Sequence, residues 1–132
     1  MGARTTLIYH VVLTTKYRRK ALLGIEQETY RAFREIEDHS CFKILDMGIE
    51  DGNHIHLVIK SSPQYSVSGI VNRLKGWSLY HLWNNSSEHL SSFYRGEKKK
   101  LWNGGYDCNT VGKVSQDKIL EYVKSQNGES EK

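Results

Sequence analysis

The spacing of apolar residues in the first half of the chain predicts strand, helix, strand and strand. Residues 7–14 (LIYHVVLT) are rich in β-branched and aromatic side chains, which favour a strand. Over residues 25–39 the apolar positions recur with the period of an amphipathic helix. Strand-like runs over 41–49 and 54–60 flank Asp51-Gly52, a dipeptide typical of two-residue hairpin turns.

The second half predicts a helix, a strand and a last helix. Ser66 is a good N-cap for a helix over residues 67–84, and residues 105–111 resemble a fourth strand. Ser115 caps a final helix that runs to about Gln126. The order βαββαβα predicts an α+β fold of the ferredoxin-like type, with a four-stranded antiparallel sheet and an extra C-terminal helix.

The hairpin between the second and third strands fixes which residues share a face. With a two-residue loop, Ile49 lies opposite His54 and Met47 lies opposite His56. The other face of the third strand carries Ile55, Leu57 and Ile59. Both faces of the sheet are then apolar, so we expect helices or a partner chain to cover each of them.

The tripeptide His54-Ile55-His56 begins the third strand and is the first candidate for chemistry. Residues two apart in a strand share a face, so the two imidazoles project side by side like the two arms of a metal chelator. For this motif alone, two unrelated strand histidines are the commoner explanation. Other features of the chain must therefore decide between a metal-binding pair and two unrelated histidines.

Composition narrows the class of protein. A chain of 132 residues fits one domain, and its net charge of +4 favours an anionic partner such as nucleic acid without requiring one. Cys41 and Cys108 stand far apart, which suits a reducing compartment. Without a leader-like or membrane-spanning apolar segment, we expect a cytoplasmic protein of a prokaryotic cell, with no membrane partner. The polar residues 127–132 should form a frayed tail.

The last predicted helix adds a second candidate group. Tyr122 and Gln126 are four residues apart and share a helical face. Three features together then resemble one family: the His54-Ile55-His56 motif, the opening residues 9–20 with their basic connector, and the stretch from residue 106 to Gln126. Their order and spacing are similar to those of the single-tyrosine HUH transposases of the insertion-sequence 200/605 family.

The resemblance implies a metal-dependent transposase that cleaves and rejoins single-stranded DNA at the ends of an insertion sequence. His54, His56 and Gln126 would bind a divalent cation, either Mg²⁺ or Mn²⁺, and Tyr122 would form a covalent 5′-phosphotyrosine. Two imidazoles favour a softer ion than Mg²⁺, so we expect Mn²⁺ to bind more tightly in vitro. One departure is Asn53, where many members carry Asp before the first histidine.

The resemblance also implies recognition of DNA hairpins and a homodimer whose subunits share their active sites. Basic residues are candidates for phosphate contacts, and exposed aromatic residues for stacking on unpaired bases. The best candidates are Arg18, Arg19, Lys20, Arg73, Lys75 and Tyr80. Trp83 and Trp102 are further stacking candidates, although Trp102, like Trp77, is equally suited to a core.

Two other functions fit the same pattern. A non-catalytic ferredoxin-like module that binds nucleic acid would use the basic and aromatic residues but would leave the histidine pair unexplained. A replication-type or domesticated HUH nickase would keep the chemistry without moving an element. The single domain and the lone helix tyrosine favour the transposase.

Overall fold

The structure is a computed structural model that describes residues 6–95 and 100–113. The predicted last helix, Tyr122, Gln126 and the polar tail lie outside the described residues. Within the described part, no helix is both long enough and apolar enough to cross a lipid bilayer.

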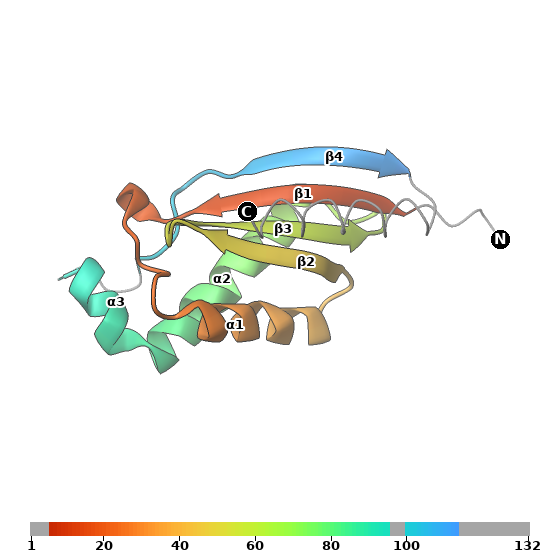
Figure 1. Cartoon of the computed structure of the whole chain (residues 1–132). Helices are drawn as coiled ribbons and strands as arrows, with labels where there is room; N and C mark the ends of the chain where they lie inside the picture. The colour runs from red at the N-terminus through yellow and green to blue at the C-terminus, as the bar shows by residue number, and fades with distance from the viewer. Residues whose placement is uncertain (1–5, 96–99, 114–132) are drawn as a thin grey trace.

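Four antiparallel strands form one sheet, as the sequence predicted. The strands are β1 (Leu7–Thr14), β2 (Lys43–Glu50), β3 (His54–Ser61) and β4 (Asp107–Lys113). Their order across the sheet is β2-β3-β1-β4, so the two chain-distant strands β1 and β3 lie in the centre. Figure 1 shows the sheet above the helices. This is the ferredoxin-like arrangement that the element order implied.

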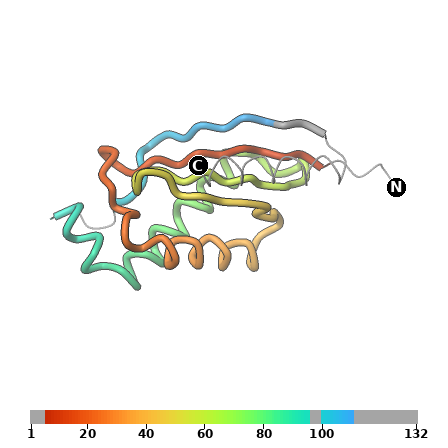
Figure 2. Tube along the Cα trace, in the orientation of Figure 1, coloured from red at the N-terminus to blue at the C-terminus, as the bar shows by residue number. Residues whose placement is uncertain are grey.

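The two long helices pack side by side on one face of the sheet. They are α1 (Glu26–Asp38) and α2 (Val67–Asn85), and the Cα trace in Figure 2 follows them below the strands. Ser66 caps α2 as predicted, because its hydroxyl accepts a hydrogen bond from the Gly69 amide at 3.1 Å. We call the sheet face turned away from these helices the outer face.

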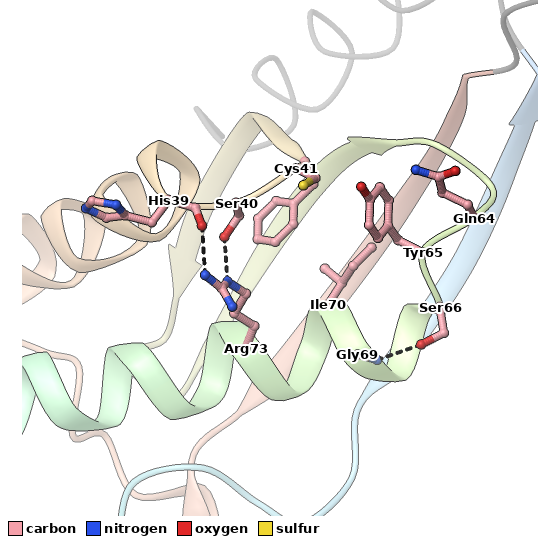
Figure 3. A pocket seen from close by; sticks show the side chains of 10 residues that line it. His39, Ser40, Cys41, Gln64, Tyr65, Ser66, Gly69, Ile70 and Arg73 are labelled. Carbon is pink, nitrogen blue, oxygen red and sulfur yellow. Dashed lines mark hydrogen bonds between the residues drawn. The ribbon is translucent and has the colours of Figure 1, made fainter.

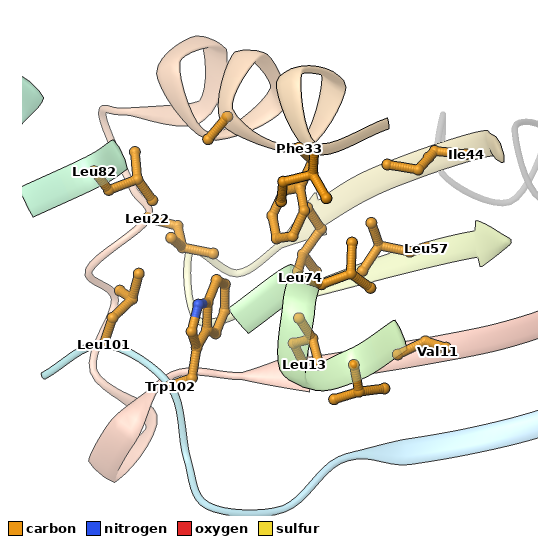
Figure 4. Packing of buried hydrophobic residues seen from close by; sticks show 14 of the residues in the cluster. Val11, Leu13, Leu22, Phe33, Ile44, Leu57, Leu74, Leu82, Leu101 and Trp102 are labelled. Carbon is orange, nitrogen blue, oxygen red and sulfur yellow. The ribbon is translucent and has the colours of Figure 1, made fainter. Parts of the chain in front are cut away.

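A continuous apolar core fills the space between the sheet and the helices. Figure 4 shows Phe33 of α1 and Leu74 of α2 meeting Leu57 of β3 in its middle. Trp102 closes one end of this core at 8% exposure and donates from Nε1 to the Ser78 hydroxyl at 2.9 Å. Trp102 is therefore a core residue, and the alternative prediction that it stacks on bases is wrong.

The register of the β2–β3 hairpin differs from the prediction. The loop has three residues, Asp51 to Asn53, and the pairs are Glu50 with His54, Ile49 with Ile55 and Gly48 with His56. A shift of one residue moves every side chain of a strand to the other face. Ile49 and Met47 therefore pack against the core, and the predicted pairing with the histidines is wrong.

The outer face is consequently more polar than expected. Its buried apolar residues are Ile8 and Val58, with Leu45 packed against them. None of the described α-helices covers this face (Figure 1). The expected cover over it stays a prediction.

Three other local features depart from the sequence pattern. Helix α3 (Ser87–Phe93) occupies a stretch for which the sequence pattern predicted no element, and Leu90 is its buried anchor. Strand β4 begins two residues later than predicted, at Asp107, which pairs with Val12 of β1. Trp77, which from the sequence was equally suited to a core, is 40% exposed.

Gly52 holds the three-residue turn in place, and replacing it should destabilise the fold. Its φ is +69°, and an added Cβ would lie 2.9 Å from the Leu23 Cβ. Gly52→Ala is expected to lower the free energy of unfolding by about 1–3 kcal/mol, measured by urea denaturation. Gly76→Ala, in an open position of α2, is the matched control and should stabilise by roughly 0.5–1 kcal/mol. Equal effects of the two changes would contradict this role of the turn.

Candidate metal centre and its surroundings

The two histidines of the motif lie side by side on the outer face, as predicted. His54 pairs with Thr14 and His56 pairs with Val12 of β1, so both imidazoles rise from the centre of the sheet. Their ring centroids are 5.1 Å apart. Both rings are partly exposed, and a ligand can therefore reach them from solvent.

Glu50 lies beside the two histidines because the turn between β2 and β3 has three residues. Its Oε1 lies 2.7 Å from Nε2 of His56 and 3.1 Å from Nε2 of His54. Hydrogen bonds from His54 and His56 lower the pKa of the Glu50 carboxyl below its usual value. We call Glu50, His54 and His56 the histidine cluster.

Each histidine uses its second ring nitrogen to contact a neighbour. Nδ1 of His54 lies 2.7 Å from Oδ1 of Asn53, and Nδ1 of His56 lies 3.1 Å from Nε2 of His10. An amide oxygen only accepts, so the contact with Asn53 engages Nδ1 of His54 as a donor and leaves Nε2 as the ring atom that faces Glu50. Metal-binding histidines in proteins are oriented by such outer contacts.

The histidine cluster has donor atoms that could hold a divalent ion. Its three ligand atoms all lie within 4.8 Å of one another. The two nitrogen-to-oxygen separations, 2.7 and 3.1 Å, are close to the roughly 3 Å between adjacent ligands of an octahedral ion with bonds near 2.1 Å. Two imidazoles and a carboxylate suit Mn²⁺ and related ions. A bound ion would take the place of the contacts that the two imidazoles make with Glu50.

Three of the predicted DNA-binding cations, Arg19, Lys75 and Arg73, are already bonded within the protein. Arg19 donates to the Phe93 carbonyl and lies over the rings of Tyr17 and Tyr94. Lys75 donates to the carbonyls of Asn103 and Gly105 at 2.8 and 2.9 Å, and burial lowers its pKa. These contacts give Arg19 and Lys75 roles in holding the structure.

Arg73 is bonded in a hollow at the other end of the sheet. Figure 3 shows its guanidinium reaching Ser40 and His39, at 2.7 Å from each acceptor. The hollow has a volume of about 390 Å³ and lies beyond the end of β3, whereas His54 begins that strand. Arg73 thus braces the end of α1 against α2, away from the histidine cluster.

Arg18, Lys20 and Tyr80, the rest of the best candidates for DNA contact, are exposed, whereas Trp83 is partly buried against the core. Arg18 lines a hollow that also includes Thr14, the strand partner of His54. Lys20 is exposed, and Tyr80 is 66% exposed on α2, beside Trp77 at 6.4 Å between ring centroids. Helix α2 covers the face opposite to the histidines, so Tyr80 and the cluster do not meet.

The sequence alone did not identify Glu50 and His10 as residues that contact the two histidines. Glu50 could be found only from the true loop length, because the assumed two-residue loop places Ile49 opposite His54. His10 lies on β1, and its contact with His56 depends on the β1–β3 register. Tyr122 and Gln126 lie outside the described residues, so their predicted roles remain predictions.

The described residues thus define a ferredoxin-like protein with a histidine pair and a carboxylate, a donor set for a divalent cation, on the outer face of its sheet. Comparison with known proteins gives the family. The family described as "Transposase IS200 like" matches residues 3–126, so the chain belongs to the IS200-like transposases. This membership supports an enzyme that cleaves and transfers DNA strands, and it disfavours the non-catalytic binding module.

Two individual relatives of this chain are also transposases. The chain is 33% identical to the transposase for insertion sequence element IS200 of Salmonella typhimurium over 119 residues, which covers 89% of this chain and 75% of that protein. It is 26% identical to the ISDra2 transposase TnpA of Deinococcus radiodurans over 121 residues, covering 91% and 84% of the two chains.

Solved structures share the fold. A crystal structure described as a candidate transposase from Deinococcus radiodurans R1 superposes with a TM-score of 0.74 at 25% identity, covering 96% of this chain and 95% of the other. A tyrosine transposase associated with REP sequences, solved bound to a REP hairpin, gives a TM-score of 0.54 at 10% identity over 93% and 65% of the chains.

Metal affinity should depend on Glu50 and on the support that Asn53 gives to His54. Asn53→Leu removes the acceptor for Nδ1 of His54 and is expected to weaken Mn²⁺ binding about tenfold, measured by titration calorimetry. Asn53→Asp keeps an acceptor and serves as the control. Glu50→Gln should also weaken binding, because it removes a negative charge from the cluster. Unchanged affinity in Asn53→Leu and Glu50→Gln would contradict this description of the site.

Proposed function

We propose that this chain is a transposase that cleaves and rejoins single-stranded DNA through a covalent 5′-phosphotyrosine. The observation that carries the proposal is the convergence of His54 and His56 on Glu50, on the open face of the sheet of an IS200-like transposase. The donor set fits a divalent cation, and Mg²⁺ or Mn²⁺ is the proposed cofactor, with Mn²⁺ the tighter ligand in vitro.

The proposed ligands are His54, His56 and Gln126, with Glu50 as an additional oxygen donor. A divalent ion bound there would neutralise charge on a non-bridging oxygen of the scissile phosphate and orient the bond for in-line attack. Asn53 and His10 would hold the two imidazoles in the required orientation through their second nitrogens.

Tyr122 is the proposed nucleophile. Its phenol oxygen would form a bond to phosphorus while the bond to the 3′-oxygen breaks, leaving a 5′-phosphotyrosine and a free 3′-hydroxyl. A phenol has a pKa near 10 and is a weak nucleophile at neutral pH, so it needs the electrostatic help of the site. Because the phosphodiester energy is kept in the tyrosine ester, a second 3′-hydroxyl can reseal the strand without ATP.

The proposed substrate is single-stranded DNA that folds into hairpins at the ends of an insertion sequence. Support comes from the family and from the fold shared with a protein that was solved on a REP hairpin. Among the predicted contacts, Arg18 lines a hollow together with Thr14, the strand partner of His54. Lys20 and Tyr80 remain candidates for more distant contacts.

A homodimer with shared active sites is part of the proposal. Strands β2 and β4 are the two edges of the sheet, and an unpaired edge is a ready site for pairing with a second copy. In such a dimer Tyr122 of one subunit would act beside the histidines of the other.

Adduct formation tests the chemistry. Incubating the protein with single-stranded oligonucleotides that carry candidate hairpin ends, in Mn²⁺, should give a protein–DNA species that survives denaturing electrophoresis. EDTA and Tyr122→Phe should each remove it, and Tyr106→Phe is the matched control that should keep it. An adduct that persists in Tyr122→Phe would overturn the assignment of the nucleophile.

Mixing two inactive variants tests the shared site. His56→Ala should abolish cleavage while hairpin binding largely remains, and Tyr122→Phe lacks the nucleophile. If subunits exchange and sites are shared, the mixture forms an adduct on the His56→Ala subunit, which is distinguished by a size tag. A mixture as inactive as its parts, with exchange verified by pull-down of the tag, would mean that each site is built within one subunit.

A further inference from the structure

A single hairpin carries all the donors of the histidine cluster. Glu50 is the last residue of β2, His54 and His56 begin β3, and a three-residue turn separates the two strands. The three ligand atoms lie within 4.8 Å of one another. In the part of the chain that the structure describes, no other three histidine, cysteine or acidic side chains come together in this way. The donors of the cluster therefore come from one hairpin of one subunit.

Gly48 on β2 lets Glu50 reach both imidazoles. Gly48 pairs with His56 and has no side chain, so its diagonal neighbour Glu50 can extend across to His56. Oε1 of Glu50 then lies 2.7 Å from Nε2 of His56 and 3.1 Å from Nε2 of His54, its direct strand partner. A single carboxylate oxygen thus serves both histidines.

The turn and the neighbouring strand β1 already orient the two imidazoles. Nδ1 of His54 lies 2.7 Å from the side-chain oxygen of Asn53. The His56 ring stacks on the His10 ring of β1, with centroids 5.2 Å apart and planes inclined by 23°. The Thr15 amide donates to the Asn53 carbonyl at 2.9 Å, which ties the turn to the end of β1. Donors held in this way lose little freedom when they bind a ligand.

The charge of the cluster also favours a cation. Glu50 contributes a carboxylate, and the number of charged ligands and the rigidity of a site together set its affinity for divalent ions. Gln126, the third ligand that the family resemblance implies, offers only a neutral amide oxygen. The Glu50 side chain is 54% exposed and both imidazoles are partly exposed, so the donors are open to solvent.

We infer that Glu50, His54 and His56 hold the divalent cation without help from the predicted helix that carries Tyr122. The inference rests on the proposed function. Each subunit is then loaded with metal before Tyr122 reaches the site. Gln126 joins a set of ligands that is already sufficient, and it contributes to positioning rather than to affinity. Metal loading is therefore a property of a single subunit, even where two subunits share an active site.

Titration of the full chain with Mn²⁺ in the absence of DNA tests the inference, with binding followed by loss of the EPR signal of free Mn²⁺. Gln126→Ala and Tyr122→Phe should each change the dissociation constant by less than about twofold. Glu50→Gln should raise it about tenfold or more, because it removes the negative charge of the ligand set. Asp51→Asn removes an equal charge from the adjacent residue of the turn and is the matched control, which should bind Mn²⁺ like the wild type.

Two outcomes of the titration would overturn the inference. One is a Gln126→Ala variant that binds Mn²⁺ as weakly as Glu50→Gln does, and the other is a Glu50→Gln variant whose affinity is unchanged. Because the titration contains no DNA and needs no reaction at Tyr122, loss of the covalent adduct would instead count against the proposed function.

Discussion

The three-residue turn from Asp51 to Asn53 is the constraint on which the rest of the structure depends. Its length pairs Glu50 with His54. The alternation of side chains along each strand then determines which residues of β2 and β3 face the core and which face outward. Met47 and Ile49 face the core, while Glu50, His54 and His56 face outward. A loop shorter by one residue would bury a carboxylate and expose the apolar residues, so packing and chemistry select the same register.

Asn53 connects this turn to the rest of the site. Its backbone carbonyl accepts from the Thr15 amide at 2.9 Å, and its side-chain oxygen contacts His54 at 2.7 Å. Thr15 in turn holds the short 3₁₀ helix η1 (Lys16–Arg18), because its hydroxyl donates to the Arg19 carbonyl at 2.6 Å. One residue therefore touches both the candidate metal centre and the segment that lines the neighbouring hollow. An Asp at this position could accept the same bonds but would add a charge beside the cluster.

Much of this architecture could be predicted from the sequence. Helix and strand periodicity placed β1, α1, β3 and α2 to within one or two residues, because each has a long apolar pattern. The pattern does not encode loop length, so the register and the part played by Glu50 were missed. Helix α3 has a single buried anchor, Leu90, and so gives no periodic signal. The two histidines were found because their spacing of two survives any error in register.

The roles assigned to basic residues were the least predictable part. Charge alone does not distinguish Arg18, which faces solvent, from Arg19, Arg73 and Lys75, which bond backbone or hydroxyl oxygens in the fold. A long cation binds whichever acceptor the tertiary structure brings near it. Only the structure therefore separates the cations that hold the protein together from those that remain available to a phosphate.

The central claim is that a metal bound at His54 and His56 enables Tyr122 to attack DNA. Mass spectrometry of the tryptic peptides after reaction with single-stranded DNA tests it most directly, because Tyr122 is the only tyrosine in the peptide of residues 119–124. The account predicts a nucleotide attached to this peptide in Mn²⁺ and none in EDTA. A nucleotide on a peptide with another tyrosine, or the same yield in EDTA, would contradict it.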